Sequence, residues 1–202
     1  MENKSARADH EDKAFTFYRS GDYRSALAEF SLSLRSKESW TSYQGLGWTL
    51  FALHKYSASI QAFKRSISIC HDFYSYCGLG WSLFKLKKYR LAINAFKTSI
   101  AIKKNTSSFQ GLGASLSNVY LYYAASEALY KAVALKGEWN SYQLLGWSTL
   151  KDNKPLEVIK AFKQSDALQT HWFTLQGLGF AYYAEGNFSK AIESFKLSLQ
   201  LH

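Results

Sequence analysis

The feature that most constrains the fold of this chain is a motif that recurs every 33 residues. The segment Gln44-Gly45-Leu46-Gly47-Trp48 returns in related form at residues 77–81, 110–114, 143–147 and 176–180. A row of bulky residues keeps the same period and comprises Phe30, Phe63, Phe96, Leu129, Phe162 and Phe195. A row of small residues follows three positions later and comprises Ser33, Ser66, Ser99, Ala132, Ser165 and Ser198. Six copies in constant register indicate a chain built from one repeated supersecondary unit.

Each copy contains two helical patterns. In the second copy, Tyr43, Leu46 and Leu50 lie at positions i, i+3 and i+7, which is the spacing of one face of a helix. Phe63 and Ser66 belong to a second face of this kind, and a short polar turn separates the two patterns. The glycines of the motif let two backbones approach closely, although the extra first glycine is equally consistent with clearance for a bound ligand. A lone helix pair cannot bury both of its faces, so the copies must stack.

These residues resemble the tetratricopeptide repeat family. That family's pattern of an aromatic residue, a Leu-Gly pair and a phenylalanine between two small residues is matched by Tyr43, Leu46-Gly47, Ser59, Phe63 and Ser66. The resemblance implies an all-α fold, a right-handed superhelical solenoid of stacked antiparallel helix pairs. We expect residues 1–6 to form a polar tail and residues 7–202 to form a single solenoid. Its six repeats are expected at residues 7–39, 40–72, 73–105, 106–138, 139–171 and 172–202.

The sequence departs from the family pattern at the repeat boundaries and at both ends. The unit is 33 residues long, whereas 34 is usual, and the closing proline of each repeat is absent, which alters the turn between repeats. The first repeat has His10 and Lys13 where later repeats carry an aromatic residue and leucine, which suits a cap that faces water. The last repeat stays apolar through Leu197, Leu199 and Leu201, so we expect its outer face to lack a polar capping helix.

A separate stripe of each first helix carries the candidate partner-binding residues. An amide can pair with both the N–H and the C=O of an extended backbone, and a neighbouring Trp supplies apolar area. The resemblance places this stripe on a concave groove. The candidate residues are Gln44, Trp48, Phe51, Cys77, Trp81, Phe84, Gln110, Ala114, Gln143, Trp147, Gln176, Phe180 and Tyr183. The alternative is that these side chains only pack between adjacent first helices.

The positive charge of the chain is concentrated in one third of its length. The net charge is +10, and residues 40–105 hold ten Lys and Arg side chains against Asp72 alone. This distribution favours an acidic partner, an anionic membrane surface or nucleic acid, but a solvated face has the same composition. The candidate basic patch comprises Lys55, Lys64, Arg65, Lys87, Lys88, Arg90 and Lys97.

Several functional classes have no support in the sequence. The five histidines are scattered without metal-ligand spacing, and the Gly-Leu-Gly segments lack the third glycine of a nucleotide loop. Cys70 and Cys77 match neither a disulfide framework nor a zinc motif. We therefore predict no catalytic residues, no metal and no cofactor. No apolar run is long enough to span a membrane, and we expect a cytoplasmic protein.

Four functional hypotheses follow. The leading one is a non-catalytic scaffold that binds an extended segment of a partner protein in the concave groove. The second is nucleic-acid binding, which the sequence disfavours because the Lys rows are not interleaved with the groove aromatics. The third is a substrate-recruiting arm of a larger enzyme such as a transferase. The fourth is self-assembly into a homo-oligomer through the uncapped C-terminal face.

Overall fold

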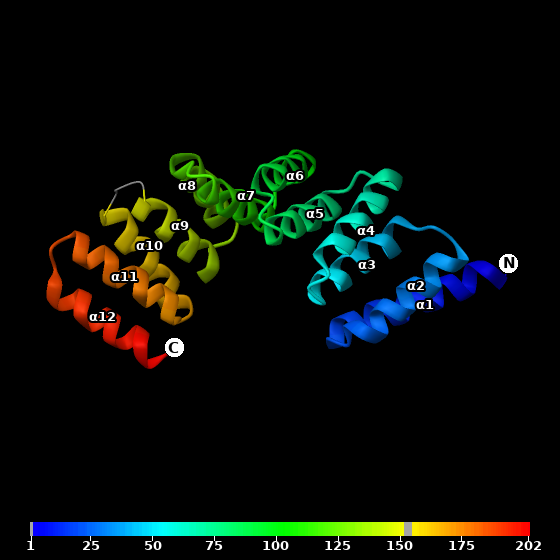
Figure 1. The fold of residues 1–202 in the computed structure, drawn as a ribbon, viewed down its shortest axis with the longest axis horizontal. Helices are drawn as coiled ribbons and strands as arrows, with labels where there is room; N and C mark the ends of the chain where they lie inside the picture. Colours follow the sequence, from blue (N-terminus) through cyan, green and yellow to red (C-terminus); the bar gives the residue numbers. More distant parts are fainter. Residues whose placement is uncertain (1, 152–154) are drawn as a thin grey trace. The chain divides into compact units, whose positions relative to one another are not determined.

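The computed structural model describes residues 2–151 and 155–202, and every regular element within them is an α-helix (Figure 1). Successive helices fold back on one another in pairs, one pair for each repeat. The packing divides the chain into two compact units, and the boundary in sequence falls between Lys104 and Asn105. Each unit contains three helix pairs.

The first unit contains α1 (Glu2–Ser20), α2 (Tyr23–Ser36), α3 (Trp40–Ala52), α4 (Tyr56–Ile69), α5 (Phe73–Lys85) and α6 (Tyr89–Ile102). The second contains α7 (Thr106–Asn118), α8 (Tyr122–Leu135), α9 (Trp139–Lys151), α10 (Pro155–Leu168), α11 (Trp172–Ala184) and α12 (Phe188–Gln200). The expected polar tail at residues 1–6 coincides with the start of α1 from Glu2 onward, and residue 1 lies outside the described residues. The prediction of a single solenoid domain stays a prediction.

In the first four repeats and the last, the turn inside the helix pair uses a left-handed residue at a fixed place in the repeat. Gly21 and Gly186 have φ of 84° and 81°, and His54, Lys87 and Tyr120 occupy the equivalent position with φ of 59°, 58° and 64°. Only glycine enters this region without a steric penalty, so three of the described turns carry local strain. The helix that follows the turn is capped by a side chain in the first repeat, where Asp22 accepts the N–H of Ser25.

The core of each unit is built by a phenylalanine that fits between two glycines. Phe63 is fully buried, and a Cβ atom added to Gly47 of its own repeat would lie 2.7 Å from its ring. A Cβ atom added to Gly78 of the next repeat would lie 2.2 Å from the same ring. Phe162 has the same relation to Gly146 and Gly177. The first glycine of each of these motifs therefore accommodates the phenylalanine of the preceding repeat.

One repeat boundary uses a different solution to the same packing problem. The fourth repeat has Leu129 in the phenylalanine row, and the fifth repeat has Leu144 in place of the first glycine. Leu129 is fully buried and forms a cluster with Leu145 and Ala161. Leu144 packs against this cluster. A smaller side chain on α8 and a larger side chain on α9 thus belong to the same packed cluster.

The first helices of each unit form a row of their own. In the first unit α1 contacts α3 and α3 contacts α5, and in the second α7 contacts α9 and α9 contacts α11. Among the described residues, the second helices of one unit do not contact one another in this way. We call the exposed side of these rows the first-helix face.

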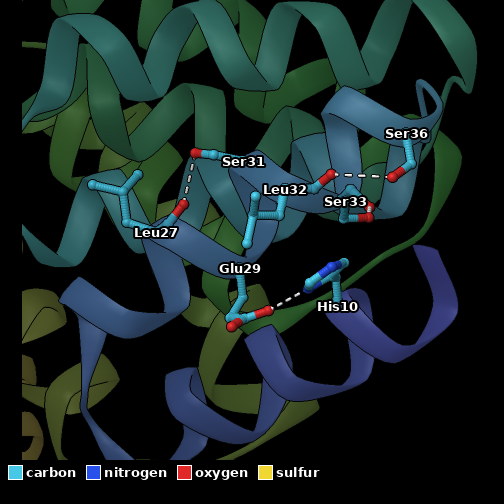
Figure 2. A network of polar contacts seen from close by, with 8 residues as sticks. His10, Leu27, Glu29, Ser31, Leu32, Ser33 and Ser36 are labelled. Carbon is cyan, nitrogen blue, oxygen red and sulfur yellow. Dashed lines mark hydrogen bonds and ion pairs between the residues drawn. The ribbon is translucent and has the colours of Figure 1, made fainter. Parts of the chain in front are cut away.

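A polar contact links the two helices of the first repeat. Figure 2 shows His10 of α1 directed toward Glu29 of α2, and His10 Nδ1 lies 2.6 Å from Glu29 Oε2. Lys13, the other polar substitution in this repeat, is exposed.

Candidate partner-binding face

The predicted glutamines connect successive repeats. Gln44 Nε2 donates to Asp72 Oδ1 at 2.8 Å and to Ser75 Oγ at 3.1 Å. Gln143 repeats this arrangement by donating to Thr174 Oγ1 at 2.8 Å. Gln110 donates to Ser141 Oγ at 2.8 Å, so three of the four candidate glutamines use their amide N–H groups inside the chain.

The glutamine bonds extend into a buried hydroxyl network. Ser75 Oγ lies 2.9 Å from Ser66 Oγ, which donates to the carbonyl oxygen of Trp40 at 2.8 Å. Both serines are fully buried, so their hydroxyls need these partners. The network explains the small-residue row: a serine at this position fits the packing and satisfies the carbonyl group at the start of its own first helix.

Trp48 sits at the centre of an aromatic cluster in the first unit. Its ring lies 5.3 Å from Phe63, 5.7 Å from Phe51 and 5.1 Å from Tyr74, measured between centroids. Its indole N–H is buried and has no acceptor among the described residues. Part of the Trp48 side chain therefore belongs to the core, while the remainder lies on the first-helix face.

A hollow of about 200 Å³ opens beside Trp48 on this face. It lies among three successive first helices, and we call it the α1–α3–α5 hollow. Its lining consists of Phe15, Tyr18, Arg19, Gln44, Gly45, Trp48 and Tyr74. Burial raises the pKa values of the Tyr18 and Tyr74 phenols, which keeps both neutral at physiological pH. The hollow is thus lined mainly by aromatic side chains, with the guanidinium group of Arg19 among them.

Five of these lining residues are absent from the predicted set, Gly45 among them. Phe15 and Tyr18 lie 33 residues before Trp48 and Phe51, so the repeat register alone could have identified them. Arg19 follows Tyr18 directly, and Tyr74 lies in the first turn of α5, where no motif marks it. The sequence prediction treated each first helix alone. The hollow is instead shared by three first helices, and α1 and α5 contribute Arg19 and Tyr74 from repeat positions outside the predicted stripe.

The equivalent stripe in the second unit is more exposed. Trp147 stacks on Phe173 with centroids 4.6 Å apart and contacts Phe180 at 6.2 Å. Phe180 and Tyr183 of α11 are 45% and 64% exposed. These two rings therefore offer aromatic surface on the first-helix face, whereas the Trp147 N–H is buried without an acceptor among the described residues.

The remaining predicted residues vary in accessibility. Cys77 and Ala114 are buried, and Gln176 is half-buried. Trp81 is half-buried and packs on Phe84 and Phe96 with centroid distances of 5.6 and 5.3 Å. The candidate basic patch, in contrast, is exposed at all seven of its positions on α4, α6 and the adjoining turns.

A second hollow lies in the second unit, where it is lined by residues of α8, α9 and α10. It has a volume of about 590 Å³ and opens between α8 and α10 above α9. The Tyr130 hydroxyl donates to Glu157 at 2.5 Å across it. Burial of Tyr130, together with this bond, raises the pKa of its phenol to about 12. The hydrogen bond links two second helices, α8 and α10, whose described backbones do not approach each other closely.

The described residues hold neither a candidate metal site nor a candidate membrane span. They contain no group of three or more His, Cys, Asp or Glu side chains placed to hold a metal ion. None of their helices combines the length and the apolar character that a membrane span requires.

Comparison with known proteins identifies the fold. A family model for the tetratricopeptide repeat matches residues 73–106. No curated protein matches the chain. MamA from Desulfovibrio magneticus is 20% identical over 82% of this chain and 96% of its own, with a TM-score of 0.73. Pseudomonas aeruginosa pilF is 11% identical over 100% and 94%, with a TM-score of 0.86. YrrB, described as a TPR protein with an unusual peptide-binding site, is 17% identical over 86% and 92%, with a TM-score of 0.71.

The comparisons define a tetratricopeptide repeat at residues 73–106 and the fold of such repeat proteins for the chain. Residues 73–106 match the family directly, and the helix pairs of the described residues have the solenoid fold that these solved structures share. The predicted resemblance is confirmed by the match at residues 73–106, and the predicted all-α repeat fold is confirmed.

Proposed function

We propose that this chain is a non-catalytic scaffold that binds an extended segment of a partner protein on its first-helix face. The α1–α3–α5 hollow carries the proposal, because it is a concave aromatic site on the face that the stripe of Gln44, Trp48 and Phe51 predicted. The fold that the chain shares with YrrB, a peptide-binding protein by its description, supports a peptide as the partner class.

The size and chemistry of the hollow restrict what it can hold. Small-molecule and cofactor pockets span about 300–1,000 Å³, whereas this hollow has about 200 Å³, which suits one anchoring side chain. Aromatic walls favour an aromatic or large aliphatic anchor. The exposed guanidinium of Arg19 at the rim favours a carboxylate next to that anchor in the partner sequence.

The glutamines have a positioning role in this proposal. Gln44 donates to Asp72 and Ser75, so its N–H groups are already used when a partner arrives. It fixes α3 against α5, and Trp48 and Tyr74 lie on those two helices. The unpaired Trp48 N–H offers a donor beside the hollow, and a partner carbonyl that reached it would relieve the cost of an unsatisfied buried group.

A peptide array with paired variants tests the proposal. The array presents extended peptides that carry an aromatic or aliphatic anchor with and without an adjacent Asp or Glu. We expect anchor-plus-acid peptides to bind the native chain and to be lost in Arg19→Glu and in Tyr74→Ala, both of which change exposed side chains. Arg65→Glu makes the same charge change on α4 and serves as the matched control.

The outcome shows whether the peptide binds on the first-helix face or elsewhere on the molecule. Equal retention by the native chain and both hollow variants would refute the proposal. Loss of binding in Arg65→Glu alone would assign recognition to the basic patch. Circular dichroism of each variant confirms that any loss reflects the contact surface and not unfolding.

The recruiting-arm and nucleic-acid hypotheses stay predictions. The basic patch lies on second helices and their turns, and none of its residues lines the α1–α3–α5 hollow.

A further inference from the structure

The hollow between α8 and α10 has the dimensions of a small-molecule site. Its volume of about 590 Å³ lies within the range of about 300–1,000 Å³ that such sites occupy, whereas the α1–α3–α5 hollow is smaller. We call it the α8–α9–α10 hollow. Val133, Leu145 and Ala161 form its apolar lining, and Tyr130 and Tyr142 add two aromatic rings. Apolar and aromatic lining with a few polar groups is typical of sites that bind organic molecules.

The α8–α9–α10 hollow lies where the chain departs from its own repeat. Its apolar lining belongs to the cluster that contains Leu129 and Leu144, which replace a phenylalanine and a glycine. Tyr130 and Glu157, which also line the hollow, are two further departures. Other repeats carry Lys64, Lys97 and Lys163 in the register of Tyr130, and Ala58, Leu91 and Ala124 in the register of Glu157. Departures from a repeat pattern that gather at one place are expected at functional sites.

Glu157 supplies an anionic group with one oxygen still available. Its Oε2 accepts the hydrogen bond from the Tyr130 hydroxyl at 2.5 Å, and its Oε1 has no hydrogen-bond partner among the described residues. Because the pKa of Tyr130 is about 12, its phenol stays protonated at physiological pH and remains the donor. Burial is the main cause of that raised pKa, and the charge of Glu127 on α8 contributes to it. Two carboxylates therefore lie near this end of the hollow.

The lysine of the hollow leaves this negative end uncompensated. Lys160 is the one cationic residue in the described lining. At about 100° per residue, it lies about 60° farther from the buried face of α10 than Glu157 does, so it points more directly into solvent. The described ion pairs do not include one between these two side chains. The alkyl part of Lys160 lines the rim, and its ammonium group can extend into water.

We propose that the α8–α9–α10 hollow binds an amphipathic organic cation, with an ammonium group on Glu157 and an apolar body on Val133, Leu145 and Ala161. The ammonium group donates to Glu157 Oε1, and the Tyr130 hydrogen bond holds that carboxylate in place. The ring faces of Tyr130 and Tyr142 attract a cation as well. An anion of the same size would meet Glu157 and be repelled.

Calorimetric titration with three probes of one shape tests the proposal. Phenethylamine, phenethyl alcohol and hydrocinnamate share a phenyl ring on a short chain and differ in the charge at its end. We expect the amine to bind most tightly and hydrocinnamate most weakly. Glu157→Gln removes the charge, keeps an acceptor for Tyr130, and should weaken amine binding about tenfold while leaving alcohol binding unchanged. Glu193→Gln makes the same change at an exposed position of α12 outside the hollow and is the matched control.

A second variant tests the positioning of the carboxylate. Tyr130→Phe keeps the ring and removes the hydrogen bond to Glu157. We expect the ratio of amine affinity to alcohol affinity to fall, because only the charged contact depends on that bond. A change in the packing of α8 alone would alter the affinities for both probes equally. Both substituted side chains are exposed, and circular dichroism confirms that the fold is retained.

A peptide distinguishes the two sources of such a cation. A Phe-Lys peptide with blocked termini carries the same chemistry on a backbone. Tighter binding of this peptide than of phenethylamine would assign the site to a lysine of a partner protein, and weaker binding would assign it to a free amine. No binding of either cation at millimolar concentration, equal or tighter binding of the alcohol or hydrocinnamate, or an amine affinity unchanged in Glu157→Gln would overturn the proposal. None of these variants lines the α1–α3–α5 hollow, so binding of the anchor-plus-acid peptides there is an independent readout.

Discussion

The substitution Gly78→Ala tests the packing of a phenylalanine between two glycines most directly. The added Cβ would lie 2.2 Å from Cζ of Phe63, in a ring that is fully buried and held from its other side by Gly47. Neither the ring nor α5 can move without disturbing an adjacent repeat. We therefore expect the substitution to destabilise the chain although alanine is the better helix former.

Two opposing effects set the change that Gly78→Ala makes to the free energy of unfolding. Replacing glycine by alanine inside a helix stabilises by about 1 kcal/mol. Forcing an extra carbon into a packed core costs about 1–3 kcal/mol, and a contact this short places the cost near about 3 kcal/mol. The net loss is about 2 kcal/mol, which lowers the melting temperature of a chain of this size by about 4–8 °C at roughly 2–4 °C per kcal/mol.

Urea denaturation followed by circular dichroism measures the effect. Gly137→Ala is the control, because an added Cβ there meets only the end of the Tyr142 side chain, with the hydroxyl oxygen at 3.1 Å. Phe63→Leu in the Gly78→Ala background should recover part of the loss, since a leucine row member already coexists with a bulky residue at Leu129 and Leu144. A Gly78→Ala chain as stable as the Gly137→Ala control would refute the packing argument.

Three further predictions concern the turns, the repeat-to-repeat bonds and the caps. Tyr120→Gly should raise stability by about 1 kcal/mol, because it removes a side chain from a left-handed residue that is 78% exposed; a lower thermal midpoint would contradict this. Gln44→Leu should cost about 1–3 kcal/mol by removing donors to Asp72 and the buried Ser75, measured as a lower urea midpoint. The pKa of Asp22 is lowered in the folded chain, chiefly by the hydrogen bond from the Ser25 hydroxyl, so its stabilisation is present above its unfolded pKa of about 3.9 and is lost as pH falls through the folded value. Comparing thermal midpoints with Asp22→Ala should therefore show a difference at neutral pH that shrinks in acid, and a difference constant with pH would refute the assignment.

The helices could be predicted from the sequence because periodicity reports which residues share a face. Phe63, Ser66 and the Leu-Gly pairs recur without a slip, and the structure places the expected helix pairs there. The pairing of Leu129 with Leu144 was also visible as two coincident departures from their rows. Only the structure shows that both side chains belong to one hydrophobic cluster.

The purpose of the extra glycine and of the glutamines could not be predicted. Register shows that Gly78 and Gln44 recur, but a glycine that faces a ligand and one that faces Phe63 have the same sequence pattern. An amide likewise forms the same kind of bond with a partner backbone as with Ser75. Choosing between these roles requires the distance across a repeat boundary, which depends on how two helix pairs pack and not on either pair alone.

The position of Phe63 between glycines of two different repeats has a consequence for how such a chain can be rearranged. The packing contact joins the phenylalanine of one repeat to the first glycine of the next repeat. This contact therefore crosses the boundary of the unit that recurs in the sequence. Cutting and rejoining the chain at repeat boundaries therefore separates contact partners that belong together. We expect that a repeat carrying Leu144 can be transplanted only behind a repeat that carries leucine at the position of Leu129, because a phenylalanine there would compete with Leu144 for the same space.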